Sequence, residues 1–465
     1  MEDPLFFTDA TEMAAKVRGG ELSPVDLVGA HLDRIALINP KINAIATLVE
    51  DALDQARDAE AAAGKSEFRG PLHGVPITVK DVFDTAGLRS TRGSLLFSDL
   101  APDADATAVA RLKSAGAILI GKTNTPEFAL RAETSNRLFG CTLHPYDADR
   151  TCGGSSGGEA AAIAAGLSPL GIGTDLGGSN RLPSHYCGIV GLKATHGRIP
   201  LTGSWPALMG RHMHVGPLCR TVRDAALALE VLSGPDQMDP WATTAPWTRP
   251  DLLGGDIAGL RVGFFEVGPF APVDPQIRSA VVRAATVLAE CGAVIEEVDF
   301  DWGDCLAIDV CMAMVVGEGE HYLRAFVAGR ENELTEQIAG LLALPPPALE
   351  DFLTSMDKRD QLAADVTRYF EDHDILLCPT SPTLAHGHDA ETLEIDGREA
   401  GVGHAANITA TFGMTGSPAI SVPFATSSEG LPIGVQVVAD HFQEPLMFEV
   451  AAALEEAGEQ THPAL

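Results

Sequence analysis

The fifty residues from Thr151 to Pro200 are unusually rich in glycine, and they constrain the fold more than any other part of the sequence. Twelve of the fifty are glycine, whereas glycine makes up about 7% of average protein sequence. Glycine at this density marks places where the backbone approaches a ligand or another backbone closely, or where φ is positive. Two of the glycine clusters hold serine, with Ser155 and Ser156 in the first and Ser179 in the second. The segment is therefore either a pair of tight turns around a small-residue helix or an active site built from main-chain amides and hydroxyls.

The apolar periodicity of the remaining sequence predicts an α/β protein. Patterns typical of a strand, a helix and a second strand follow one another over residues 260–298, which predicts a crossover unit. No internal repeat or low-complexity linker divides the chain. We therefore expect a single domain over residues 1–465, made of an N-terminal helical clasp (1–65), a core (70–230), a variable α/β and helical part (231–372) and C-terminal core strands with a helix (373–465).

The net negative charge of the chain disfavours anionic binding partners. The sequence has 64 acidic and 32 basic side chains, which give a formal net charge of −32. Such a surface repels phosphate backbones and anionic lipid, so we expect neither nucleic acid nor a membrane as a partner. No signal peptide is visible, and the eight cysteines have no repeated short spacing. We therefore expect a cytoplasmic protein with reduced thiols and no zinc site.

Lys80 lies at the end of a short apolar run, Val75 to Val79, that is typical of a buried strand. Two interpretations of this lysine remain open. It could pair with Asp81 or Asp84 at the surface. Alternatively it could be buried, because desolvation lowers the pKa of a lysine and makes the neutral amine a usable base.

A series of ordered motifs resembles the amidase signature family of serine hydrolases. The resemblance is dense over residues 70–230 and returns near the C-terminus. Its motifs are Gly74-Val-Pro-Ile-Thr-Val-Lys-Asp, Gly121-Lys-Thr-Asn-Thr-Pro-Glu-Phe-Ala, Thr134-Ser-Asn-Arg-Leu-Phe-Gly, Gly153-Gly-Ser-Ser-Gly-Gly, Gly173-Thr-Asp-Leu-Gly-Gly-Ser, Cys187-Gly-Ile-Val-Gly-Leu-Lys, Gly197-Arg-Ile-Pro, Pro418-Ala-Ile-Ser-Val-Pro and Leu431-Pro-Ile-Gly-Val-Gln.

The resemblance implies a fold and a catalytic triad. The fold is α/β, with a large twisted mixed β-sheet flanked by helices on both faces. In the triad Ser179 is the nucleophile, Ser155 is a bridging serine that follows a cis peptide bond, and Lys80 is the base. The backbone N–H groups that the resemblance assigns to the oxyanion hole are those of Leu176, Gly177, Gly178 and Ser179.

The implied chemistry is physically consistent. A serine hydroxyl is a weak nucleophile until a base takes its proton, and a charged lysine cannot be that base. Lys80 must therefore be neutral, and Ser155 can relay the proton to it from Ser179. The oxyanion needs amide donors, each of which typically contributes roughly 10²–10³ in rate. The residues expected to support the loop around the nucleophile are Ser156, Thr174, Asp175 and Arg181.

We therefore expect an amidase that needs neither a cofactor nor a metal and acts on C–N bonds other than peptide bonds through an acyl-enzyme. The expected substrate is a small to medium amide of the aryl acylamide, oligoamide or carbamate (urethane) type, and the expected state is a monomer or homodimer. The resemblance places Ala129 at the wall of the substrate pocket. Six further candidates rest on loop placement and apolar or aromatic character, with core packing as the alternative for each: Phe128, Asn180, Trp205, Met209, His214 and Met314.

Two other functions remain open. The stretch Gly153-Gly-Ser-Ser-Gly also fits the nucleophile elbow of α/β-hydrolases, which would make Ser155 the nucleophile of an esterase with Asp374 and His404 as candidate partners. Within the family, the alternative is a glutamine-hydrolysing amidotransferase subunit of a tRNA-dependent complex. The charge of the chain argues against that alternative, and so does Leu182, because those subunits typically carry glutamine at the matching position.

Overall fold

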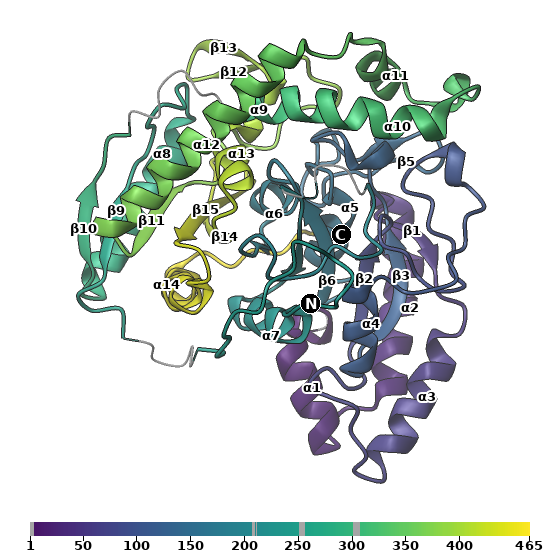
Figure 1. The fold of residues 1–465 in the computed structure, drawn as a ribbon. Helices are drawn as coiled ribbons and strands as arrows, with labels where there is room; N and C mark the ends of the chain where they lie inside the picture. Colours follow the sequence, from purple (N-terminus) through teal and green to yellow (C-terminus); the bar gives the residue numbers. More distant parts are fainter. Residues whose placement is uncertain (1–3, 207–209, 211, 251–255, 301–306) are drawn as a thin grey trace.

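One large mixed sheet forms the centre of the protein, shown in Figure 1 as a computed structural model. The structure describes residues 4–206, 210, 212–250, 256–300 and 307–465. Within these residues the sheet has eleven strands. Their order from edge to edge is β1 (Ile45–Leu48), β3 (Ile118–Thr123), β2 (Pro76–Lys80), β6 (Leu170–Asp175), β8 (His214–Cys219), β7 (Val190–Lys193), β14 (Ala419–Thr426), β15 (Pro432–Ala439), β11 (Ile375–Pro379), β9 (Arg261–Phe264) and β10 (Val294–Glu297).

The sheet combines parallel and antiparallel pairing. Strand β2 runs parallel to β3 and β6, and β9 runs parallel to β10 and β11. The other neighbouring strands pair antiparallel. The crossover unit predicted over residues 260–298 is confirmed, because β9 and β10 are parallel neighbours joined through a helix. Two small hairpins lie outside this sheet: β4 (Ser135–Asn136) with β5 (Gly140–Cys141), and β12 (Thr392–Ile395) with β13 (Arg398–Gly401).

Helices flank both faces of the sheet, which confirms the predicted fold class (Figure 1). Two of the longer ones begin at capping side chains, Ser23 before α2 and Asp274 before α8. The helices are α1 (Ala10–Gly19), α2 (Pro24–Ile42), α3 (Ala52–Ala63), α4 (Thr107–Ser114), α5 (Gly157–Ala164), α6 (Arg181–Cys187), α7 (Val222–Leu232), α8 (Pro275–Glu290), α9 (Ala307–Met314), α10 (Glu320–Val327), α11 (Glu336–Ala343), α12 (Leu349–Asp372), α13 (Asn407–Thr415) and α14 (Glu444–Ala457).

The N-terminal segment differs from its prediction at one element. Residues 45–48 form strand β1, which pairs antiparallel with β3 at the edge of the sheet. The strand follows directly on α2, because Asn43 takes the left-handed conformation (φ 53°) that ends that helix. A run of four residues is too short for its apolar pattern to distinguish a strand from the end of a helix. The N-terminal segment therefore contributes a strand to the core in addition to its helices.

Helix α5 is buried on every side, including its single acidic residue, Glu159. A helix that is apolar all round belongs in a protein interior. Small residues let it lie directly against the chain beside it, since a Cβ at Gly158 would lie 2.6 Å from the backbone nitrogen of Asn124. The glycine-rich segment therefore contains the central helix of the protein, with one of the two serine loops at its start.

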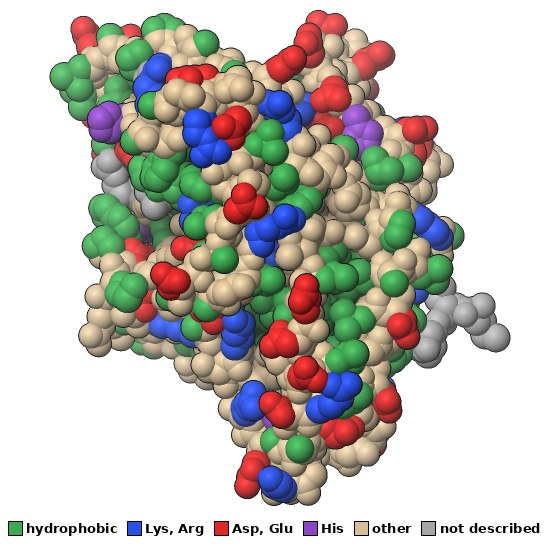
Figure 2. All heavy atoms as spheres, turned by 90° about the vertical axis from the view of Figure 1, so that its right-hand side faces the viewer, with side chains coloured by type: hydrophobic (Ala, Val, Ile, Leu, Met, Phe, Trp, Pro, Cys, Tyr) green, Lys and Arg blue, Asp and Glu red, His purple; other side chains and the backbone are tan. Residues whose placement is uncertain are grey.

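The surface is mixed in charge on the face shown in Figure 2. Described Lys and Arg side chains are interspersed there with Asp and Glu, and they do not merge into one basic patch. None of the helices in the described ranges is both long enough and apolar enough to cross a membrane.

A buried ion pair ties the segment after β7 to α14. Arg198 Nε and Nη2 lie 3.0 Å and 2.9 Å from the two carboxylate oxygens of Glu444, and both side chains are almost completely buried. Replacing Arg198 by alanine leaves a buried carboxylate without its partner. We predict that Arg198→Ala lowers the free energy of unfolding by about 3–5 kcal/mol, measured by urea unfolding.

The matched control is Arg368→Ala, which breaks a pair with Asp365 whose arginine side chain is 65% exposed. Exposed pairs contribute less than about 1 kcal/mol. A loss of stability in Arg198→Ala no larger than that of the control would contradict the structural role of the buried pair.

Candidate active site

Lys80 is the last residue of β2 and is completely buried. Its Nζ makes hydrogen bonds with Ser155 Oγ at 2.7 Å and with Thr174 Oγ1 at 2.9 Å. Burial lowers the pKa of Lys80 to about 7, although the charges of Asp175 and Glu159 oppose the shift. The interpretation of Lys80 as a surface ion-pair residue is therefore wrong.

The acidic residues considered as surface partners of Lys80 bind other cations. Asp81 is itself buried and lies 3.3 Å from Lys122 Nζ, and Asp84 pairs with Arg92 at 3.0 Å. The two direct partners of the Lys80 amine are hydroxyls, which can donate as well as accept hydrogen bonds. An uncharged amine can therefore accept a hydrogen bond from one hydroxyl while it donates to the other.

Glu159 is a second buried titratable group near Lys80, and it is absent from the residues predicted from the sequence. Its carboxylate accepts hydrogen bonds from Thr78 Oγ1 and, at 2.8 Å, from Thr123 Oγ1. Burial raises the pKa of Glu159 to about 7, against the effect of these hydrogen bonds and of Lys80. The protonation of the carboxyl and that of the amine therefore depend on each other. The signal in the sequence is one acidic residue in the otherwise apolar stretch from Gly157 to Gly166.

Ser155 lies in the loop that leads into α5, and the Gly154–Ser155 peptide bond is cis, as the resemblance implies. The carbonyl oxygen of Ser155 accepts a hydrogen bond from Thr125 Oγ1 at 3.0 Å. A Cβ at Gly154 would lie 2.7 Å from the backbone nitrogen of Glu133 and 2.8 Å from the carbonyl oxygen of Arg131. Only glycine fits at position 154, because those neighbours are backbone atoms that cannot move aside cheaply.

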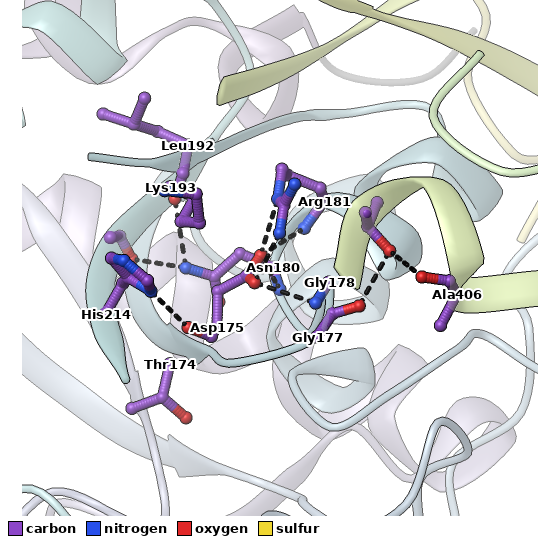
Figure 3. A network of polar contacts seen from close by, with 12 residues as sticks. Thr174, Asp175, Gly177, Gly178, Asn180, Arg181, Leu192, Lys193, His214 and Ala406 are labelled. Atoms are coloured by element: carbon purple, nitrogen blue, oxygen red, sulfur yellow. Dashed lines mark hydrogen bonds and ion pairs between the residues drawn. The ribbon is translucent and has the colours of Figure 1, made fainter. Parts of the chain in front are cut away.

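Ser179 lies in the loop between β6 and α6, next to the first serine cluster. The backbone N–H of Ser156 donates to the carbonyl oxygen of Ser179 at 3.1 Å, so the two glycine clusters are hydrogen-bonded to each other. Thr409 Oγ1 lies 2.8 Å from the carbonyl oxygen of Gly177 and 3.0 Å from that of Ala406, and its single hydrogen is shared between these two acceptors (Figure 3). The loop that carries Ser179 is therefore held by the first cluster on one side and by α13 on the other.

A buried ion pair supports the same loop. Arg181 Nη2 and Nε lie 2.8 Å and 2.9 Å from the two carboxylate oxygens of Asp175 (Figure 3). Burial acts to raise the pKa of Asp175, but the Arg181 guanidinium and the Asn180 N–H outweigh it and hold that pKa below its ordinary value. The structure thus brings Asp175 and Arg181 together beside the loop, as predicted from the sequence.

One predicted oxyanion donor is already engaged. The backbone N–H of Gly178 donates to Asp175 Oδ1 at 2.8 Å, because the buried carboxylate takes the donors nearest to it. The prediction that this amide faces the oxyanion is therefore wrong for this conformation of the loop. The amides of Leu176, Gly177 and Ser179 have no hydrogen-bond acceptor among the described residues. These three amides are the ones left for an oxyanion.

Asn180 and Ser156 hold each other and the strands behind the loop. Ser156 Oγ donates to Asn180 Oδ1 at 3.0 Å, and Asn180 Nδ2 donates to the carbonyl oxygens of Leu192 and Gly216 at 3.1 Å and 3.3 Å. All polar atoms of the Asn180 side chain are thus used within the protein.

A cavity of about 560 Å³ opens beside Ser179, a volume suited to a small-molecule ligand. Its lining is mostly apolar and comes from the Ser179 loop, the segment 129–133, helices α9 and α11, and the segment 386–406. Arg131 and Glu133 add charge to one part of the wall. The apolar lining residues include Ala129, Leu130, Leu176, Leu182, Ile308, Cys311, Met312, Val315, Ile338, Leu341 and Leu344.

Of the residues predicted to contact the substrate, Ala129 lines this cavity. Four others are buried elsewhere: Phe128 and Trp205 pack in one aromatic cluster, His214 Nδ1 lies 3.0 Å from the carbonyl oxygen of Asp175, and Met314 is completely buried. Asn180 is also absent from the lining. At these five positions the structure shows internal packing. Met209 lies outside the described residues.

The residues considered for a nucleophile elbow are not brought together. Asp374 pairs with Arg261 at 2.9 Å, whereas His404 contacts the carbonyl oxygen of Pro272 and the side chain of Asn407. Ser155 itself is 1% exposed and is hydrogen-bonded to Lys80. The side chain of Ser155 thus contacts Lys80, and the backbone of the next residue, Ser156, is hydrogen-bonded to Ser179.

Comparisons with known proteins show the family to which the chain belongs. A family model described as Amidase matches residues 26–448. The chain is 34% identical over 472 residues to an indoleacetamide hydrolase of Bradyrhizobium diazoefficiens, which covers 97% of this chain and 87% of that protein. It is also 34% identical over 480 residues to a glutamyl-tRNA(Gln) amidotransferase subunit of Carboxydothermus hydrogenoformans, with 97% of each covered. The crystal structure of a bacterial aryl acylamidase of the amidase signature family superposes with a TM-score of 0.90 at 28% identity, and covers 98% of this chain and 97% of that chain.

The fold and the site together define a hydrolase that acts on C–N bonds. The chain belongs to the amidase signature family.

Proposed function

We propose that this protein hydrolyses small carboxylic amides with an apolar or aromatic part, through an acyl-enzyme on Ser179. The observation that carries the proposal is the contact of 2.7 Å between the buried amine of Lys80 and Ser155 Oγ. Ser155 in turn belongs to the loop that is hydrogen-bonded to the Ser179 loop. Lys80 is the base, Ser155 passes the proton, and Ser179 is the nucleophile.

In each half of the reaction the protons move along the path between Ser179, Ser155 and Lys80. Ser179 Oγ attacks the carbonyl carbon of the amide, its proton moves to Ser155 Oγ, and the Ser155 proton moves to Lys80 Nζ. When the tetrahedral intermediate collapses and the C–N bond breaks, the same path returns a proton to the leaving amine. Water then attacks the acyl-enzyme along the same route and releases the carboxylic acid. The amides of Leu176, Gly177 and Ser179 stabilise the negative oxygen in both halves.

The cavity supports an apolar substrate. Leu, Ile, Val, Met and Ala side chains form most of its wall, and Arg131, Glu133, Gln337 and His386 add polar groups. Aryl acylamides fit this environment, as do oligoamide units and carbamates with an apolar chain. The names of two similar proteins, an indoleacetamide hydrolase and an aryl acylamidase, point to aromatic amides within this range.

A glutamine-hydrolysing amidotransferase is the second candidate, and the similarity to a subunit of such an enzyme favours it. The cavity argues against it. Leu182 lines the wall at the position where those subunits typically carry glutamine. A leucine at this position cannot form hydrogen bonds with the polar side chain of a glutamine substrate. Glutaminase activity that appears only with added partner subunits would support this candidate instead.

A fluorophosphonate probe tests which serine is the nucleophile. We expect intact-mass analysis and peptide mapping to show one adduct on Ser179, because its loop lines the cavity and carries the three oxyanion donors. Ser179→Ala should abolish labelling and amide turnover. The control is Ser184→Ala on α6, which replaces a buried serine that does not line the cavity. An adduct on Ser155 would contradict the assignment.

The pH dependence of amide hydrolysis tests the role of Lys80. Because its pKa is lowered to about 7, the amine is charged and inactive below this pH and neutral above it. We predict that kcat/KM rises with pH through about 7 and then levels off. Lys80→Met should reduce turnover by at least about 10²-fold at every pH. A profile with no rise between pH 6 and 8 would contradict the proposal.

The variant Glu159→Gln tests how the neighbouring carboxylate affects the pKa of Lys80. The negative carboxylate favours the ammonium form of Lys80, so its removal should lower the pKa of the amine further. We predict that the rise in kcat/KM moves to lower pH in Glu159→Gln. The control Glu333→Gln, at a partly exposed carboxylate that pairs with Arg330, should leave the midpoint unchanged. A shift to higher pH would show that the carboxylate acts in another way.

The apolar wall predicts a preference among acyl chains. Each buried CH₂ contributes about 0.8 kcal/mol, so kcat/KM for a series of anilides should rise roughly fourfold per methylene until the cavity is filled. Leu341→Asn, at the wall on α11, should flatten this dependence while leaving acetanilide turnover nearly unchanged. The exposed control Leu353→Asn on α12 should keep the wild-type slope. An unchanged slope in Leu341→Asn would place the acyl group elsewhere.

A further inference from the structure

Three side chains with metal-binding atoms converge near the cavity. His388 Nδ1 lies 2.9 Å from Glu133 Oε1 and 3.6 Å from Cys141 Sγ. The three ligand atoms all lie within 4.8 Å of one another. Glu133 is buried and the other two residues are partly exposed, so a small ion has access to this point. The cluster is separate from Lys80, Ser155 and Ser179.

The hydrogen bonds of His388 show why these atoms need a cation between them. Its Nε2 lies 3.1 Å from the carbonyl oxygen of Ala148, which can only accept, so Nε2 carries a hydrogen. In a neutral imidazole Nδ1 then presents a lone pair, and that lone pair faces the carboxylate of Glu133. Two acceptors at 2.9 Å repel each other unless a proton or a metal ion lies between them. The sulfur of Cys141 lies near the same point.

The surroundings hold the ligands in place. The second carboxylate oxygen of Glu133 is 3.0 Å from Arg131 Nη2 and 3.2 Å from the backbone N–H of Asp389. Cys141 is on strand β5 of the β4–β5 hairpin. The contact between His388 Nε2 and a backbone carbonyl is the type of outer hydrogen bond that orients ligating histidines in metal sites.

In place of the expectation from cysteine spacing that the chain has no zinc site, we propose that Glu133, Cys141 and His388 form a binding site for Zn²⁺, with water as the fourth ligand. Thiolate, imidazole and carboxylate are the three ligand types that zinc takes in proteins, at about 2.0–2.3 Å in a tetrahedral arrangement. The separations of the ligand atoms allow this arrangement with small side-chain movements. The site does not depend on the proposed amide hydrolysis, because no residue of that mechanism is a ligand.

The location of the site gives it a mechanical consequence. Glu133 lines the cavity, as do His386 and Ala390 on either side of His388. The backbone nitrogen of Glu133 also lies where a side chain on Gly154 would have to go. A bound ion would therefore join two walls of the cavity that are more than two hundred residues apart in the sequence. We therefore expect bound zinc to raise the melting temperature of the protein.

The test is a calorimetric titration of the chelator-treated full-length protein with Zn²⁺. We expect one equivalent to bind, and we expect Co²⁺ to give a thiolate-to-cobalt charge-transfer band in the same stoichiometry. Cys141→Ser should remove that band and weaken Zn²⁺ binding by at least about tenfold. Cys291→Ser, at an exposed cysteine, is the control and should bind as the wild type does.

His388→Gln provides a second variant if Cys141→Ser folds poorly, and it should also lose the bound ion. Circular dichroism of each metal-free variant checks that the fold is retained. Absence of saturable Zn²⁺ binding would show that a proton alone joins His388 and Glu133, and would overturn the proposal. Binding that survives in both variants would place the ion elsewhere and would overturn it too. Neither measurement uses turnover, so failure here leaves the proposed amidase function untouched.

Discussion

The site depends on one buried amine that is hydrogen-bonded to two hydroxyls and, within the described part of the chain, pairs directly with no carboxylate. A lysine in the interior is normally matched by an acid, as Lys122 is by Asp81. Burial lowers the pKa of both lysines, but the direct partners of Lys80 are Ser155 and Thr174 instead, and the pKa of its amine is lowered to about 7. A base with its pKa near neutral pH accepts a proton readily and returns it readily. The end of β2, inside the large sheet, supplies this environment.

The glycine-rich segment is the reason that the hydroxyls can reach this amine. Gly154 and Gly158 lie against backbone atoms that leave no room for a Cβ, and Gly178 has a φ of +126° that L side chains rarely adopt. These positions let the two serine loops and α5 pack directly on the sheet. The ion pair of Asp175 and Arg181 then fixes the second loop from within. Close approach of main chain, rather than any large side chain, brings the reacting groups together.

The parts of the fold and site that short sequence motifs determine could be predicted from the sequence. The α/β class and the position of Lys80 at a strand end follow from the residues themselves, whereas the mixed sheet and the cis bond before Ser155 came only from the family resemblance that the motifs carry. Prediction failed where contacts join distant segments. The lining of the cavity comes from α9, α11 and residues 386–406, so Phe128, Trp205, His214 and Met314 were poor candidates for it. The hydrogen bond from Gly178 to Asp175 is local, but it depends on the conformation of the loop, which the sequence pattern does not specify. The cluster around His388 again joins distant segments.

The protonation state of Lys80 itself provides the most direct test of this mechanism. In protein labelled with ¹³C-lysine, the Cε resonance that disappears in Lys80→Met can be followed as a function of pH. We predict that this resonance titrates with a midpoint near 7, far below the 10.5 of an ordinary lysine. A midpoint near the ordinary value would mean that the amine is charged at neutral pH, and would contradict its role as the base.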